Sequence, residues 1–435
     1  MNGASDWPTL GSDALHGVAG ELCRTIEPHT EADEANLLAT FLTMFGNAVG
    51  DRAYAYADGA VHPPRLNVCI VGRTSRGRKG TGFANVRRLM EAATPTWTER
   101  IHSGLASGEG LIAAVRDGDS QNESFVAADR RLFVYESEFG RVLKVCNREQ
   151  NTLSAVLRDA WDRGTLRVMT RKDPLVATDV HISVLAHITV EELRRLLVDT
   201  EVANGFANRF LFFLTHRSKR LPDGGEVPQD ESNRIVKFIR AALEHQPAAK
   251  MKRTPEAAEL WQAIYNGLDD DADGLFGAAT ARAEAQMLRL SVVYALLDRS
   301  DLIDVAHVRA AHAVWRYCED SARFVFDGML GSQEIDKLLE ALRRAGPDGL
   351  DARAQDRVFS GHVTASRLSQ MRQELEDRKL AYTVYEETGG RPRMVTFAEH
   401  LAEKAEEADE PDYFRTSAIS AEWGGPSESV GRLSK

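Results

Sequence analysis

A glycine-rich, basic segment follows the first apolar run of the chain and holds the residues best suited to chemistry. It reads Gly72-Arg73-Thr74-Ser75-Arg76-Gly77-Arg78-Lys79-Gly80-Thr81. Phosphate groups are bound by backbone N–H groups that glycines leave accessible, by a lysine that neutralises charge, and by a hydroxyl that ligates Mg²⁺. Because the segment contains each of these parts, it predicts a site for ATP with Mg²⁺.

The spacing departs from the usual GxxxxGK[ST] pattern, which would place the lysine where this chain has Arg78. We expect Lys79 to contact the β and γ phosphates and Thr81 to ligate the metal, with a local bulge in the loop. The expected nucleotide contacts are Gly72, Thr74, Ser75, Gly77, Arg78, Lys79, Gly80 and Thr81. The alternative is a basic, glycine-rich surface turn, which a preceding strand and a following helix make the weaker interpretation.

Two carboxylates follow the next buried run, Leu132–Tyr135. Side chains alternate along an extended segment, so Glu136 and Glu138 are expected to point the same way. Glu136 would hold the metal, and the other carboxylate would polarise the attacking water. A solvated strand end is the alternative interpretation.

Three further groups of polar residues complete the set of candidates. His187 ends a later apolar run, where it would sense the γ-phosphate or simply cap the strand. Arg209 follows a glycine turn and could act in trans as an arginine finger in a ring or filament, or pair with an acid of its own subunit. Arg282 and Arg289 lie seven residues apart on one side of a helix, where they could reach the nucleotide or form a solvated basic edge.

The elements that must position these residues alternate between short buried strands and helices. This pattern indicates an α/β fold in which helices cover both faces of a parallel sheet. The expected strands are Leu66–Val71, Arg131–Tyr135, His181–Ala186 and Arg209–Leu214, and the expected helices are Phe83–Ala93, Gly108–Arg116, Thr152–Trp161, Thr189–Leu197, Glu284–Leu297 and His307–Phe324.

The region after residue 330 predicts a second folded unit. Helices are expected at Glu334–Arg344, Arg353–Phe359 and Thr364–Arg378, followed by two alternating strands around a glycine turn. Three helices and a hairpin indicate a winged helix, a module that binds nucleic acid or packs against proteins. The expected nucleic-acid contacts are Arg367, Arg372, Arg378, Arg391 and Arg393.

Composition limits the classes of protein that fit. The chain has 435 residues, 43% of them apolar, and a net charge of −11, so contact with nucleic acid has to be local. Its four cysteines form no CxxC pair and suggest neither a zinc site nor disulfides. No apolar run suits a membrane span or a signal peptide, so we expect a cytoplasmic protein without a membrane partner.

Changes in pattern along the chain suggest five regions. They are an N-terminal helical region at 1–60, an ATPase core at 61–217, a helical region completing it at 218–329, the winged helix at 330–400, and a partly disordered tail at 401–435.

In these residues the chain resembles the RecA-like P-loop ATPases of phage, plasmid and genomic-island replication modules. They form a YfjI-like family whose members are often fused to primases. The resemblance covers about residues 60 to 325 and rests on the 72–81 loop, Glu136–Gly140, the turn Asn204–Arg209 and Arg282–Asp298. It implies a RecA-like fold and an ATP-driven, hexameric, helicase-like role on DNA in replication. Any primase would be a separate protein.

The residues themselves leave other functions open. An ATPase that moves along DNA or is loaded onto it is one. Another is a scaffold, either nucleotide-gated or inactive. It would bind DNA or a protein through the winged helix, as an initiator, regulator or defence component.

Overall fold

The computed structural model describes most of the chain. The described residues are 7–73, 77–117, 129–148, 150–168, 175–197, 204–247, 249–268, 272, 274–326, 329, 332–387 and 392–399. Of the predicted site residues, Thr74, Ser75 and Arg391 lie outside them, as does the tail from 401. Contacts divide the chain into two compact units, Met1–Asp336 and Lys337–Lys435.

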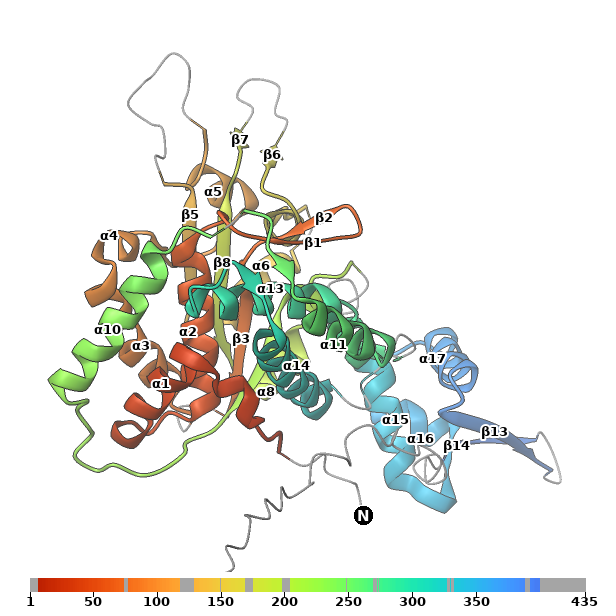
Figure 1. The fold of residues 1–435 in the computed structure, drawn as a ribbon. Coiled ribbons are helices and arrows are strands. Elements are labelled where there is room, and N and C mark those ends of the chain that lie inside the picture. Colours follow the sequence, from red (N-terminus) through yellow and green to blue (C-terminus); the bar gives the residue numbers. More distant parts are fainter. Residues whose placement is uncertain are drawn as a thin grey trace, which may run out of the picture. The chain divides into compact units, whose positions relative to one another are not determined.

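The first unit is built on a five-stranded sheet (Figure 1). Its strands lie in the order β4-β5-β8-β3-β9, and every pairing is parallel. They are β3 (Asn67–Gly72), β4 (Ile101–His102), β5 (Arg131–Glu136), β8 (His181–Ile188) and β9 (Leu211–Thr215). All residues of β3, β8 and β9 are buried, which explains why these strands appear in the sequence as continuous apolar runs.

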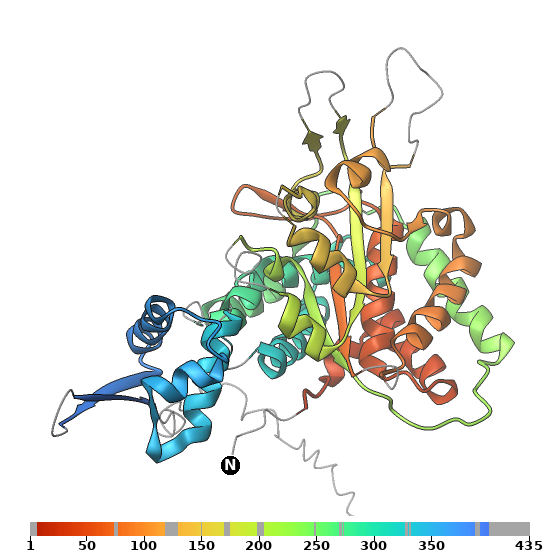
Figure 2. The ribbon, with the colours of Figure 1, turned by 180° about the vertical axis from the view of Figure 1, so that it is seen from behind.

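Helices cover both faces of this sheet, as Figures 1 and 2 show from opposite sides. Alternate strand residues enter two different apolar cores: Ile70 and Leu185 join one, Val71 and Ala186 the other. The first core is formed with α1 (Gly17–Ile26), α2 (Glu34–Val49), α3 (Lys79–Ala93), α10 (Gln229–Glu244), α13 (Ala283–Leu297) and most of α14 (Val305–Phe326). The second is formed with α5 (Gly108–Ala113), α6 (Phe139–Cys146), α7 (Leu153–Asp162), α8 (Val190–Leu196) and α12 (Gly274–Thr280). The predicted α/β architecture with a parallel sheet is therefore confirmed.

Short elements complete this unit. They are η1 (Ser12–Leu15), η2 (Glu27–His29), β1 (Ala55–Ala57), β2 (Ala60–His62), α4 (Pro95–Thr98), β6 (Leu166–Val168), β7 (Leu175–Ala177), η5 (Ala207–Arg209), β10 (Lys252–Arg253), α11 (Pro255–Asn266) and β11 (Leu302–Ile303).

The second unit contains the elements expected there and one more strand. Its helices are α15 (Gln333–Ala345) from Lys337 onward, η6 (Gly346–Asp348), α16 (Ala352–Val358) and α17 (Ala365–Asp377). β12 (Leu350–Asp351), β14 (Arg393–Ala398) and β13 (Ala381–Glu386) form an antiparallel sheet in that order. α17 buries Leu368, Met371 and Leu375, which recur on one side of the helix.

Candidate functional site

The first turn of α3 lies at the carboxyl end of β3 and begins at Lys79, four residues earlier than predicted. Within the described chain, no group accepts a hydrogen bond from the amides of Lys79 or Gly80. A Cβ built on Gly80 would meet no atom within 4 Å, so open space adjoins this residue. Because free N–H groups and the helix dipole both favour negative charge, this turn can hold a phosphate.

The loop before α3 is held in place from α2. Asn36 donates from Nδ2 to the carbonyls of Arg78 and Lys79, both at 3.4 Å. A Cβ on Gly82 would lie 2.5 Å from Asn36 Oδ1, so glycine is required for this close approach. Arg78 itself is left-handed, with φ of 48°, which is the local irregularity that precedes the helix.

Lys79 folds back over the end of β3. Its Nζ donates to the carbonyls of Gly72 at 3.4 Å and Arg73 at 3.3 Å. Burial lowers the pKa of Lys79, although Cys69 and the nearby Glu138 oppose the shift. Two long hydrogen bonds satisfy an ammonium group poorly, so this cation is available to an anion that enters the loop.

His187 lies inside β8, beside Ile70, rather than after the end of the strand as predicted. Its Nδ1 is 3.4 Å from the hydroxyl of Tyr135, and the Tyr135 ring stacks on Phe83 of α3 with centroids 3.6 Å apart. Burial, helped by the charge of Lys79, lowers the pKa of His187 to about 3. The imidazole is therefore neutral, and its buried Nε2 has no hydrogen-bond partner among the described residues.

The two carboxylates after β5 do not share a direction, contrary to the prediction. β5 ends at Glu136, and Glu138 is the exposed N-cap residue of α6, so strand alternation does not extend to it. Glu136 is buried and accepts hydrogen bonds from the amides of Gly104 at 2.5 Å and Leu105 at 2.6 Å. Its other oxygen pairs with Arg141 at 3.0 Å. Glu136 thus anchors the loop after β4, whereas Glu138 remains open to a ligand.

Arg78 is engaged away from the α3 amides. Its Nε forms an ion pair with Glu31 Oε2 at 2.5 Å, and the same carboxylate accepts from the Leu221 amide at 2.9 Å and from Arg217. Lys79 is therefore the better placed of the two predicted cations to meet a phosphate on α3.

The arginines predicted to serve the nucleotide lie at the opposite, amino edge of the sheet. Arg209, just before β9, and Arg282, at the N-cap of α13, both bind Asp162, at 2.5 and 3.0 Å. Arg289 is buried, donates to the Arg65 and Trp161 carbonyls, and lies 3.6 Å from the Trp161 ring centroid.

This position decides what these arginines can reach in their own subunit. Arg65 precedes β3 and Gly72 ends it, so at ~3.3 Å per residue the two edges are about 20 Å apart. Neither Arg282 nor Arg289 can contact phosphates held by the first turn of α3 in the same chain. Arg209 forms the internal ion pair that was one of its two predicted roles.

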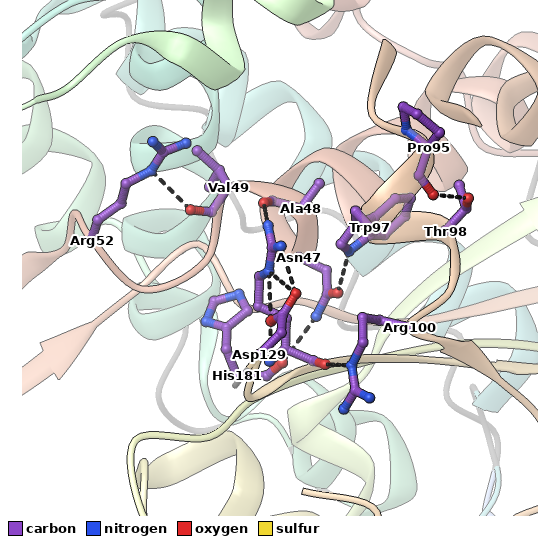
Figure 3. A network of polar contacts seen from close by, with 11 residues as sticks. Asn47, Ala48, Val49, Arg52, Pro95, Trp97, Thr98, Arg100, Asp129 and His181 are labelled. Carbon is purple, nitrogen blue, oxygen red and sulfur yellow. Dashed lines mark hydrogen bonds and ion pairs between the residues drawn. The ribbon is translucent and has the colours of Figure 1, made fainter. Parts of the chain in front are cut away.

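Sequence reasoning missed the buried polar groups that hold the amino edge together. Arg65 donates to the Val180 carbonyl at 2.7 Å, and burial lowers its pKa to about 10. Asn47 near the end of α2 accepts from Trp97 Nε1 at 2.9 Å and donates to the His181 carbonyl (Figure 3). It also donates to the carbonyl of Leu132. Only long-range contacts create these roles, so nothing in local spacing could have indicated them.

The predicted nucleic-acid contacts of the second unit are largely paired with other side chains. Arg372 donates to Gln355 at 3.0 Å, and Arg378 binds Glu374 at 2.7 Å. Arg393 binds Asp351 and Glu386. Arg367 lies in the first turn of α17, where its amide donates to the hydroxyl of Thr364. The carboxylates paired with Arg378 and Arg393 reduce the cationic charge that the unit offers to phosphates.

Across the described chain, one group of three side chains has the composition of a metal site: His16, Asp298 and His307. Asp304 caps α14, and the Asp304 amide donates to His307 Nδ1 at 3.0 Å. Because Nδ1 accepts this bond, His307 must carry its proton on Nε2, and Nε2 lies 3.1 Å from Asp298. A protonated nitrogen cannot ligate a metal, so this group is a hydrogen-bonded cluster. The four cysteines are buried, and none of them forms a disulfide in the described chain.

Comparison with protein-family models gives no match for this chain, and comparison with curated proteins gives none either. None of the helices in the described part of the chain combines the length and apolar character that crossing a membrane requires.

Proposed function

We propose that this protein binds ATP with Mg²⁺ at the carboxyl edge of its parallel sheet and hydrolyses it. The observation that carries the proposal is the first turn of α3, where open amides, the free space beside Gly80 and the loosely held Lys79 come together. In open α/β sheets, ligands bind outside the carboxyl ends of the strands, which is where this turn lies.

The residues present fit a triphosphate. The α3 amides and Lys79 would hold its phosphates, and neutral His187, from the neighbouring strand, would meet the terminal one. Magnesium would supply charge neutralisation across the phosphates when bound. Thr81 and Glu138 are the side chains left for its coordination shell, since Glu136 is committed to Gly104, Leu105 and Arg141.

We favour a role as a RecA-like motor of a replication module. The motor would be helicase-like or would be loaded onto DNA. The sheet order and the site at the end of β3 are compatible with a RecA-like fold. In this proposal the protein forms a ring, a hexamer in the family it resembles. Arg209 would serve the nucleotide of a neighbouring subunit only after leaving Asp162. A separate primase would act on the same DNA.

One observation favours a second candidate, a nucleotide-gated or inactive scaffold. Both oxygens of Glu136 are already hydrogen-bonded, which leaves the exposed Glu138 alone to orient water. In that case the protein binds ATP without turnover, and its second unit binds DNA or a protein partner.

Titration calorimetry with Mg-ATP tests the proposal. We expect the wild type to release heat and Lys79→Ala to bind at least tenfold more weakly, because a hydrogen bond to a charged group contributes ~1.5–3 kcal/mol. Lys144→Ala, an exposed lysine of α6, is the matched control and should bind as the wild type does. A second assay distinguishes the motor from the scaffold: DNA should stimulate phosphate release by a motor but not by a scaffold. If the wild type releases no heat with Mg-ATP, both candidates are contradicted.

A further inference from the structure

A short extended segment, Lys250–Arg253, lies beside the β1–β2 hairpin in the first unit. The Met251 amide donates to the Tyr54 carbonyl at 3.0 Å, and Tyr54 donates to the Ala249 carbonyl at 2.8 Å. Met251 is buried while Lys250 and Lys252 are exposed, as expected when side chains alternate along an extended segment. Two lysines therefore project from one side of this segment.

Aromatic rings lie directly beneath two of its cations. Lys250 Nζ is 4.0 Å from the centroid of the Tyr56 ring, and Tyr56 is 47% exposed. The Arg253 guanidinium is 4.6 Å from the Trp261 ring of α11, which contacts Tyr265, itself 53% exposed. We call Tyr56, Lys250, Lys252, Arg253, Trp261 and Tyr265 the aromatic–basic strip.

The acids closest to the strip bind other groups. β10 pairs with β11, which Asp301 and Asp304 flank, but Asp301 pairs with His245 and Asp304 caps α14. Within the described chain, none of Lys250, Lys252 and Arg253 forms an ion pair. Glu256 and Glu259 of α11 lie five and two residues before Trp261, which at 100° per residue places them on the far side of the helix. The acid that remains on the hairpin is Asp58, in its turn.

A neighbouring histidine reports the same electrostatic environment. Burial, with the charges of Arg289, Arg282 and Arg253, lowers the pKa of His62 in β2 to about 4. Of these three arginines only Arg253 belongs to the strip, whereas Arg378 and Arg393 of the second unit are each paired with carboxylates.

We propose that the aromatic–basic strip binds single-stranded nucleic acid. Unpaired cations suit the phosphates of the backbone, and exposed rings suit unstacked bases, a combination that duplex DNA cannot use because its bases are already stacked. Lys250 lies over Tyr56 of the hairpin and Arg253 over Trp261 of α11, and the three residue steps between the two cations span about 10 Å in an extended segment, so one strand can contact both. This inference rests on the nucleic-acid part of the proposed function and moves the principal contact from the winged helix to the first unit.

Fluorescence anisotropy of a labelled thymidine oligonucleotide, measured without nucleotide at several salt concentrations, tests it on the full-length protein. Lys250→Ala with Lys252→Ala should weaken binding and reduce the slope of log affinity against log salt by ~0.7 per lost phosphate contact. Tyr265→Ala should weaken binding about tenfold at every salt concentration and leave the slope unchanged, since stacking involves no counterion release.

Matched variants distinguish the strip from other surfaces and from misfolding. Tyr265→Phe keeps the ring and should retain the affinity, and Arg378→Ala with Arg393→Ala should change it little. Lys79→Ala should bind the oligonucleotide normally, so failure of the strip is separable from failure of the ATP site. The proposal is overturned if the lysine pair binds like the wild type, if the winged-helix pair alone abolishes binding, or if only duplex DNA is bound.

Discussion

The two edges of the central sheet use similar residue types for opposite purposes. At the amino edge, Arg209, Arg282 and Arg289 each donate to a fixed acceptor, either Asp162 or a carbonyl oxygen. At the carboxyl edge, Lys79 has two long contacts and His187 Nε2 has none among the described residues. Polar groups that satisfy one another stabilise a fold, whereas groups left unsatisfied are available to a ligand.

Removing the carboxylate of the amino edge is the strongest way to test this contrast. Asp162→Asn leaves Arg209, whose side chain is only 8% exposed, without a counter-charge. We expect the free energy of unfolding, measured with urea, to fall by ~3 kcal/mol, as when one member of a buried ion pair is removed. Asp159→Asn, exposed on the same helix, is the control and should change stability little. An equal, small effect of both variants would show that the amino edge does not depend on this pair.

A smaller effect is expected where α2 supports the loop of the carboxyl edge. In Gly82→Ala the added Cβ must displace Asn36, which would weaken its hydrogen bonds to Arg78 and Lys79. Overpacking of this kind costs about 1–3 kcal/mol. Gly80→Ala adds the same atom into open space and should leave thermal stability unchanged. If both variants melt alike, Asn36 is not the support we describe.

The smallest effect concerns the cluster that ties the start of the chain to α13 and α14. The hydrogen bond and charge of Asp298 raise the pKa of His16. Burial raises the pKa of Asp298, but hydrogen bonds from His16 and His307 outweigh this effect and hold it far below its usual range. The stabilisation is therefore complete only above the unfolded pKa of Asp298 and below that of His16, roughly between pH 4 and 6.5.

His16→Gln should accordingly lose ~1 kcal/mol of stability at pH 6, with the difference from the wild type shrinking as the pH rises through the raised pKa of His16. Chemical unfolding at pH 6 and pH 9 measures it. A difference that stays constant between the two values would show that His16 contributes packing rather than charge.

The sequence was informative where local pattern controls structure. Runs such as 66–71 and 182–186 are apolar because both faces of the sheet are covered, so their strands can be predicted. The prediction that Lys79 contacts phosphate depends on the glycine-rich segment that directly follows a strand. The sequence predicts a ligand or a solvated edge at Arg289 because arginine is rarely buried. The Trp161 ring and the carbonyls of Arg65 and Trp161 make its burial tolerable. Asp162 and Arg209 are 47 residues apart, so no spacing rule could join them.

Amide hydrogen exchange with and without Mg-ATP tests the central claim most directly, because it reports both edges in one experiment. We predict slower exchange at Lys79, Gly80 and Thr81, with unchanged exchange around Trp161 and Asp162 in the monomer. Unchanged exchange in the first turn of α3 at saturating Mg-ATP would contradict the account.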